Sequence, residues 1–207
     1  MRLPQIACNL CLGAAIAAMP LALAAQTTNQ SNASGTHSAM ANSTMNSGQS
    51  GTKLDAMDHT FVNKAAEGGL AEVELGKMAE TKAANPQVKQ FAERMVHDHT
   101  QANDELKQVA SDQGIQLPDH IGQKDRLLKE RLAKLSGDQF DKVYMQNMVK
   151  DHEKDVAEFQ RESKDAQNPA VRHFAQQTTP VLESHLNEAE KIAPKVEAKV
   201  GQPPMTK

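Results

Sequence analysis

Two Asn-Pro pairs open two similar stretches of this chain and divide its central part into halves. The stretch NPQVKQFA at 85–92 is echoed by NPAVRHFA at 168–175. Proline lacks a backbone N–H and disfavours helical geometry in the residue before it, so each pair ends one helix. Proline also suits the first turn of the helix that follows. The echo therefore predicts two αα-hairpins that share the same kind of turn.

The residues around these turns have the composition and periodicity of amphipathic helices. They are rich in Ala, Leu, Lys, Glu and Gln, and apolar residues recur at spacings of three and four. Four such helices predict an all-α fold, a four-helix bundle made of the two hairpins. We expect long helices over 54–84, from Pro86 to near Gly114, from Asp138 as N-cap to near Asn168, and from Pro169 to before Pro194. Pro180 should kink or interrupt the last of these helices. A short extra helix is expected over 121–135 in the middle connection.

The segments outside the bundle have other compositions. Residues 1–25 have the features of a secretory signal peptide, with Arg2, an apolar run over 6–23 and the small-x-small pattern Ala22-Leu23-Ala24. We expect a periplasmic or secreted protein after cleavage, and a membrane-anchored one if the run is kept. The Ser-, Asn-, Thr- and Gly-rich segment 26–53 predicts a disordered linker, 54–194 the bundle domain, and 195–207 a flexible tail.

Composition excludes several classes of function. Both cysteines, Cys8 and Cys11, lie in the expected leader, so the mature protein would have no thiol chemistry. Loss of Arg2 with the leader changes the formal net charge from −3 to −4, and the chain has no Trp and one Tyr. A nucleic-acid binder would need a basic stripe and stacking aromatic residues. The expected partners are a metal ion and no nucleic acid, with a homodimer as the open alternative to a monomer.

Histidines recur on the predicted apolar faces. The pentapeptide Met-Val-x-Asp-His occurs at 95–99 and at 148–152, and each copy ends in an inward histidine. His185 and Glu72 fall in the same way on the other two helices. Glu72 and His99 lie 13 residues on either side of the first turn, and His152 and His185 lie 16 on either side of the second. At 1.5 Å per residue, either connection between the hairpins brings the four groups together near mid-bundle.

These four residues predict a metal site. Neutral imidazole binds transition metals, and three histidines with one carboxylate suit Fe, Zn, Cu or Mn better than Ca²⁺ or Mg²⁺. Asp155 and Glu188 are expected to accept the second ring N–H of His152 and His185. We expect no catalytic residue and no organic cofactor. The alternatives are Glu67 or Glu74 in place of Glu72, histidines that make only hydrogen bonds in the core, and a bis-histidine haem, which the scarcity of aromatic residues disfavours.

Several motifs together resemble a known bacterial family. They are FVNKAAEGGLAEVELGKMA at 61–79, the two Met-Val-x-Asp-His elements, GDQFDKVY at 137–144 and TPVLESHL at 179–186. Over about residues 55–193 the chain resembles the family catalogued as domain of unknown function 4142. The resemblance implies a ferritin-like four-helix bundle, usually exported, with no established activity. The sequence has no Glu-x-x-His, which argues against a carboxylate-rich di-iron site.

The residues and the resemblance together give the expected function. We expect an exported helical bundle that binds a transition metal through Glu72, His99, His152 and His185, for metal buffering or for oxidative or envelope stress. The alternative is a non-catalytic envelope stress protein, structural or partner-binding, whose core histidines bind no metal.

Overall fold

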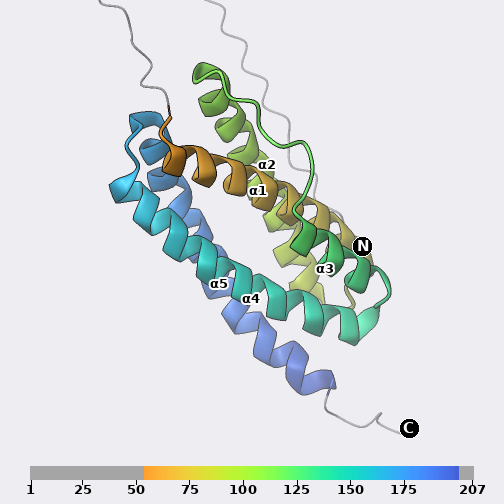
Figure 1. The fold of residues 1–207 in the computed structure, drawn as a ribbon. Coiled ribbons are helices and arrows are strands. Elements are labelled where there is room, and N and C mark those ends of the chain that lie inside the picture. Colours follow the sequence, from red (N-terminus) through yellow and green to blue (C-terminus); the bar gives the residue numbers. More distant parts are fainter. Residues whose placement is uncertain (1–53, 201–207) are drawn as a thin grey trace, which may run out of the picture. The chain divides into compact units, whose positions relative to one another are not determined.

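The computed structural model of the chain describes residues 54–200, which form five helices and no strand (Figure 1). The helices are α1 (Ala56–Lys82), α2 (Pro86–Asp112), α3 (Gln123–Ala133), α4 (Gly137–Asp165) and α5 (Pro169–Val200). The predicted all-α fold, with four long helices and one short one in the middle connection, is confirmed. The expected leader 1–25, the expected linker 26–53 and residues 201–207 lie outside the described residues.

The two Asn-Pro turns fold as the sequence predicts. The Asn85 side chain caps α2 by accepting a hydrogen bond from the Gln87 N–H at 2.9 Å, and the next residue is the proline of the first turn. The Asn168 side chain accepts one from the Ala170 N–H at 2.8 Å at the start of α5. Each turn reverses the chain, so α2 packs along α1 and α5 packs along α4. The two predicted αα-hairpins are thus confirmed.

Each turn is held by an aspartate from the other hairpin. The buried Asp141 of α4 accepts hydrogen bonds from the backbone N–H groups of residues 84 and 85, at 3.1 and 2.7 Å. The buried Asp58 of α1 accepts two from residues 167 and 168, at 3.2 and 2.6 Å. Since both aspartates lie near the start of their own helix, the two turns lie at opposite ends of the bundle. The middle connection therefore crosses the bundle, a choice that the spacing of the histidines left open.

Two apolar clusters fill the bundle. The cluster near the first turn contains Phe91 and Tyr144, and the Tyr144 ring stacks on Phe140 with centroids 5.8 Å apart. The Tyr144 hydroxyl is buried and has no hydrogen-bond partner. The cluster near the second turn is built around Phe61 and Phe159, whose rings meet edge to face at 4.9 Å. The three inward histidines belong to neither cluster and lie between them along the helices.

The last helix is longer than expected. Helix α5 runs uninterrupted through Pro180 and Pro194 to Val200, so the prediction that it ends before Pro194 is wrong, and residues 195–200 of the expected tail are helical. Beyond Pro194, the Val196 side chain is buried in the cluster at the first turn. Lys199 also donates to the Asp138 carboxylate at 2.6 Å. We attribute the extra turns to this packing, which offsets the N–H that proline lacks.

The start of α4 also differs from the expectation. The helix begins at Gly137, with Ser136 as its N-cap residue, and not with Asp138 as the cap. Gly137 has φ +59°, a conformation that glycine adopts without steric cost. The carboxylate of Asp138 is then free to pair with Lys199 of α5.

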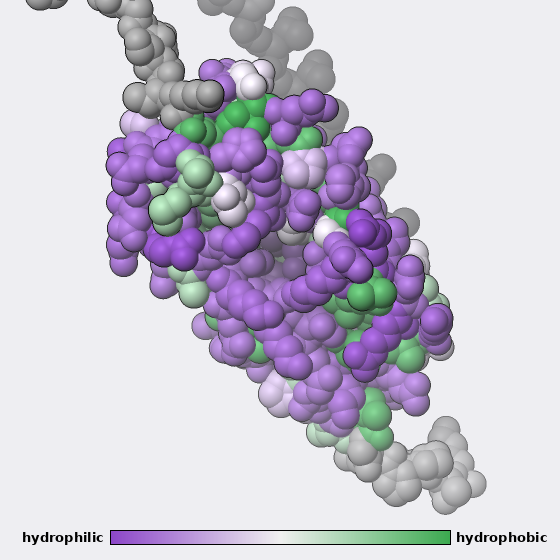
Figure 2. Space-filling view, in the orientation of Figure 1, coloured by the Kyte–Doolittle hydropathy of each residue, from purple (hydrophilic) through white to green (hydrophobic). Residues whose placement is uncertain are grey.

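The surface of the described bundle is largely polar. On the face shown in Figure 2, hydrophilic side chains cover most of the area, and hydrophobic ones form small separate patches. Within residues 54–200, none of the helices has both the length and the apolar content needed to cross a bilayer.

Candidate metal centre

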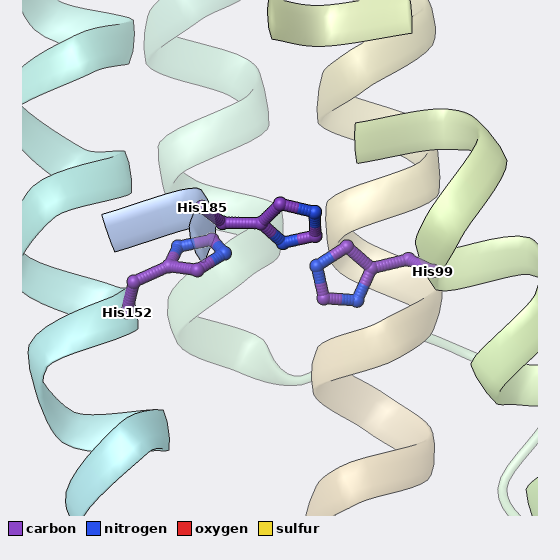
Figure 3. Close-up of side chains that lie close together, drawn as sticks. All are labelled: His99, His152 and His185. Atoms are coloured by element: carbon purple, nitrogen blue, oxygen red, sulfur yellow. The ribbon is translucent and has the colours of Figure 1, made fainter. Parts of the chain in front are cut away.

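Three of the four expected ligands meet in the middle of the bundle. His99 of α2, His152 of α4 and His185 of α5 point toward one another (Figure 3). One ring nitrogen from each lies within 4.8 Å of the other two, and the ring centroids are 5.3 to 5.8 Å apart. The exposed fractions are 7% for His99 and 0% for the other two. Three helices from both hairpins therefore bring three imidazoles to one buried point.

Hydrogen bonds fix the tautomers of two of these histidines. His152 Nδ1 lies 2.9 Å from the carbonyl oxygen of Met148, which only accepts, so Nδ1–H must be the donor. His185 Nε2 lies 2.8 Å from a carboxylate oxygen of Asp98, so Nε2–H is the donor there. The other nitrogen of each neutral ring, Nε2 of His152 and Nδ1 of His185, then carries a lone pair. Those two atoms, together with His99 Nε2, are buried and have no hydrogen-bond partner.

Burial keeps the three rings neutral near pH 7. Burial and the neighbouring His185 lower the pKa of His152 to about 4, and the hydrogen bond to Met148 only partly opposes them. Burial, followed by the charges of His152 and His185, lowers the pKa of His99 well below its usual value. Burial also lowers the pKa of His185, against the effect of Asp98. Neutral imidazole is the form that binds a metal, so the cluster is ready to do so without first losing protons.

Asp98 is the charged residue that positions His185. Its carboxylate also accepts from the Arg94 guanidinium at 3.3 Å, and Arg94 reaches across to Glu188 of α5 at 2.8 Å. Burial acts to raise the pKa of Asp98, but the hydrogen bonds from His97, His185 and Arg94 outweigh it and lower that pKa to about 2. Asp98 is therefore ionised at neutral pH and increases the electron density of the imidazole that it holds.

Asp155 and Glu188, the expected acceptors for the second ring N–H of His152 and His185, do not make these hydrogen bonds. Glu188 accepts from Arg94, and the two acceptors seen are Asp98 for His185 and the Met148 carbonyl for His152. The sequence pointed to residues three positions past each histidine, which lie on the same helix face. Asp98 lies about 100° around α2 from His99, and that rotation directs it toward α5. An acidic residue next to a predicted inward histidine is the signal that would have found it.

Glu72 is buried as predicted, but it is not part of the histidine group. It is 5% exposed, and its Oε2 has no hydrogen-bond partner. The group whose ligand atoms lie within 4.8 Å contains the histidines alone among the described residues. Burial, then the carboxylates of Asp155, Asp151 and Asp125, raise the pKa of Glu72 well above its usual value. These neighbours belong to α3 and α4, so Glu72 lies near a group of carboxylates, and its role as a ligand stays a prediction.

The histidines alone form a donor set that a transition metal accepts. In a tetrahedral zinc site with Zn–N bonds of about 2.1 Å, the nitrogens are roughly 3.4 Å apart. The limit of 4.8 Å found here exceeds that spacing by about 1.4 Å. Small side-chain rotations would close the gap. Three nitrogen donors fill three positions of a metal ion and leave at least one for water or another small ligand.

The fold and the site define a class: an all-helical bundle of two hairpins with a buried cluster of three histidines between them. The family described as Domain of unknown function (DUF4142) matches residues 43–192, and the chain belongs to this family. Among solved structures, the chain is similar to a DUF305 fragment from Deinococcus radiodurans, with a TM-score of 0.60 and 15% identity, over 69% of this chain and 98% of that one. That likeness concerns the fold. No match was found among the curated proteins.

Proposed function

We propose that this protein is a metal-binding bundle that holds one transition-metal ion through His99, His152 and His185. The observation that carries the proposal is the set of three buried ring nitrogens without partners, one on each histidine. A buried polar atom without a hydrogen bond costs about 1–3 kcal/mol. Three such atoms that converge on one point are compensated together by a single cation, and two of them have their lone pairs fixed toward it.

The donor set narrows the kind of metal. Zn²⁺, Cu²⁺, Fe²⁺ and Mn²⁺ accept imidazole nitrogen, whereas Ca²⁺ and Mg²⁺ prefer shells made of oxygen. A site of this kind suits the buffering of a metal ion or its use against oxidants.

We also propose that the protein acts outside the cytoplasm, because residues 1–25 have the features of a secretory leader. Fractionation of cells that produce the full chain, with N-terminal sequencing, tests this part: a protein in the cytosol with Met1 intact would contradict it.

Elemental analysis of the full chain, purified without chelators, tests metal binding. We expect about one equivalent of transition metal per chain. In His152→Gln and His185→Gln variants the content should fall by about tenfold or more, because each loses one of three donors. The matched control is His173→Gln, since His173 is an exposed histidine on α5. Metal content that is far below one equivalent, or that the two substitutions leave unchanged, would contradict the proposal.

One observation favours a second role for His185. Through Asp98 and Arg94 it joins α2 to α5 by a network of hydrogen bonds. In a purely structural protein, the glutamine variants would lose stability, and transition metals would not change the stability of the wild-type protein. Thermal unfolding with and without Zn²⁺ separates the two roles.

A further inference from the structure

A cavity of about 60 Å³ lies beside the histidine cluster. Residues of all four long helices line it, and His99 is one of them. The surface in Figure 2 is hollowed between α1 and α4, the two helices that contribute Lys64 and Glu158 to the lining. A space of this size holds a few water molecules. The cavity therefore connects a ligand of the proposed metal with the surface of the bundle.

The cavity has an origin in the internal repeat. Asn85 and Asn168 are 83 residues apart, and so are the two aspartates that hold the turns, Asp58 and Asp141. Positions separated by this offset thus occupy equivalent places in the two hairpins. Five residues in and around the histidine cluster correspond by this offset to residues that line the cavity. Met148 corresponds to Ala65, His152 to Gly69, His185 to Ala102, His99 to Leu182 and Glu72 to Asp155.

In three of these pairs, the residue that lines the cavity has a much smaller side chain than its counterpart. Where one half of the bundle has a methionine and two histidines, the other half has Ala65, Gly69 and Ala102. The smaller side chains of Ala65 and Ala102 leave room for the cavity, whereas at Gly69 the Asn103 side chain occupies the space that a Cβ would need. The carboxylate is kept, since Asp155 occupies the position equivalent to Glu72. The cavity thus lies at positions equivalent to the histidine site, with Gly69, Ala102 and Leu182 in place of the three histidines, and it is still next to that site.

The lining favours a cation. Asp155 and Glu158 contribute carboxylates from α4, and His99 contributes an imidazole at the inner side. Lys64, an exposed residue of α1, pairs with Glu158 at 3.4 Å and so lies at the outer side. Its charge balances that of Glu158, which leaves the Asp155 carboxylate to face the space. Asn103 and Thr178 add neutral oxygen atoms. Carboxylate and neutral oxygen atoms are ligands that divalent cations accept alongside water.

We infer that this cavity is the passage through which a divalent metal ion reaches the three histidines, with Asp155 as the transient ligand that takes the ion from water. The inference rests on the proposed function. His152 and His185 have no exposed surface, so a metal ion needs a route through the bundle. Of the three histidines, His99 lines the cavity and would receive the ion first. It then completes the site with His152 and His185, and the ion leaves Asp155.

A passage is recognised by its kinetics. A change that obstructs it raises the barrier in both directions, so the rates of association and dissociation fall by the same factor and the Kd stays the same. Ala65→Met fills the cavity with the side chain that the equivalent position 148 already has. Asp155→Asn removes the transient ligand and keeps the shape. For both variants we expect Co²⁺ association to slow by about tenfold, with the Kd within about twofold of wild type.

The measurement is stopped-flow absorption of Co²⁺ binding to the full chain, with dissociation followed after excess chelator is added. Ala157→Met and Asp165→Asn are the matched controls, because both residues are exposed on α4 and outside the cavity lining. Wild-type rates in both test variants would overturn the inference. An unchanged association rate with a weaker Kd would also overturn it, since it would make the residue a permanent ligand. Wild-type protein that binds no Co²⁺ at all would contradict the proposed function.

Discussion

The tautomers of His152 and His185 are set by acceptors of two different kinds. The Met148 carbonyl takes the Nδ1–H of His152, and the Asp98 carboxylate takes the Nε2–H of His185. The two rings therefore offer different nitrogens to the same point. The repeated pentapeptide suggests equivalent roles for its two histidines, but the contacts differ, because Asp98 reaches α5 whereas Asp151 pairs with Lys124 of α3.

Asp98→Asn should weaken metal binding without removing a ligand. The neutral amide is a weaker acceptor for His185 and loses the ion pair with Arg94, so the ring is less basic and less well oriented. Outer residues of this kind contribute about 10- to 100-fold to metal affinity, and we expect a loss of about tenfold for Co²⁺ in competition with a chelator. Asp104→Asn, at an exposed aspartate of α2, should bind as wild type. Equal affinities for the two variants would show that Asp98 does not support the site.

Acid should destabilise the metal-free protein through His152. The pKa of this histidine is about 4 in the folded chain and about 6.5 in an unfolded one. Between these values the unfolded chain binds more protons, so the free energy of unfolding falls as the pH drops from 6.5 toward 4. The full effect is about 3 kcal/mol.

Urea unfolding followed by circular dichroism, at pH 7, 5.5 and 4.5, measures this dependence. The His152→Gln variant should have a flatter profile, and His173→Gln should keep the steep wild-type one. A wild-type slope in the His152 variant would assign the acid sensitivity to other groups.

At the scale of the helices, the two hairpins are joined by reciprocal aspartates. Asp58 and Asp141 each accept two backbone N–H groups from the turn of the other hairpin. The turns alone specify a reversal of the chain, and these aspartates determine which end of the partner hairpin lies against each turn. Helix pairing along the chain is local, whereas the arrangement of the two hairpins depends on contacts between residues more than 50 positions apart.

Asp58→Asn and Asp141→Asn should each lower the free energy of unfolding. A carboxylate accepts from both N–H groups of a turn, whereas an amide accepts from one and turns its own NH₂ toward the other. Leaving one buried donor without a partner costs about 1–3 kcal/mol, and we expect about 2 kcal/mol for each variant.

Chemical denaturation checks this, with Asp112→Asn as the control because Asp112 is exposed and caps no turn. Losses below about 0.5 kcal/mol in both turn variants would mean that water replaces these hydrogen bonds readily.

For the whole molecule, metal binding should be linked to unfolding. A ligand that binds only the folded chain stabilises it by about 2.7 kcal/mol at a hundred times its Kd. We expect the Tm of the wild-type protein to rise steadily with Zn²⁺ concentration. The double variant His152→Gln/His185→Gln should show no such rise at concentrations that saturate the wild type. A similar rise in both proteins would place the metal elsewhere on the chain.

The sequence was sufficient for the parts of the fold that depend on local signals. Asn85-Pro86 and Asn168-Pro169 predict both turns, and helical periodicity predicts the inward direction of all three histidines. The crossing of the middle connection was not predicted, because it depends on Asp58 and Asp141, whose partners are far along the chain. The equal spacing from each of these aspartates to its own Asn-Pro pair was the available clue.

The sequence did not predict the directions in which Glu72 and Asp155 point, because these depend on the rotation of each helix about its axis. Spacing from a turn gives the height of a residue, and Glu72 is buried at the expected level. Its direction also depends on how α1 rotates against α3 and α4, and there it lies among carboxylates. The direction of Asp155 depends in the same way on the rotation of its helix, α4. Burial, then Asp151 and Glu158, raise its pKa to about 7, and it lines the cavity and accepts no hydrogen bond from His152.

The isolated tyrosine of this protein has a practical consequence. Tyr144 is the one tyrosine of a chain without tryptophan, and its ring is fully buried against Phe140. The intrinsic ultraviolet fluorescence of the molecule therefore has a single dominant source at a known place in the core, one helical turn below Met148 and two below His152. Emission from this residue would report on the packing directly beneath the histidines without any label being added.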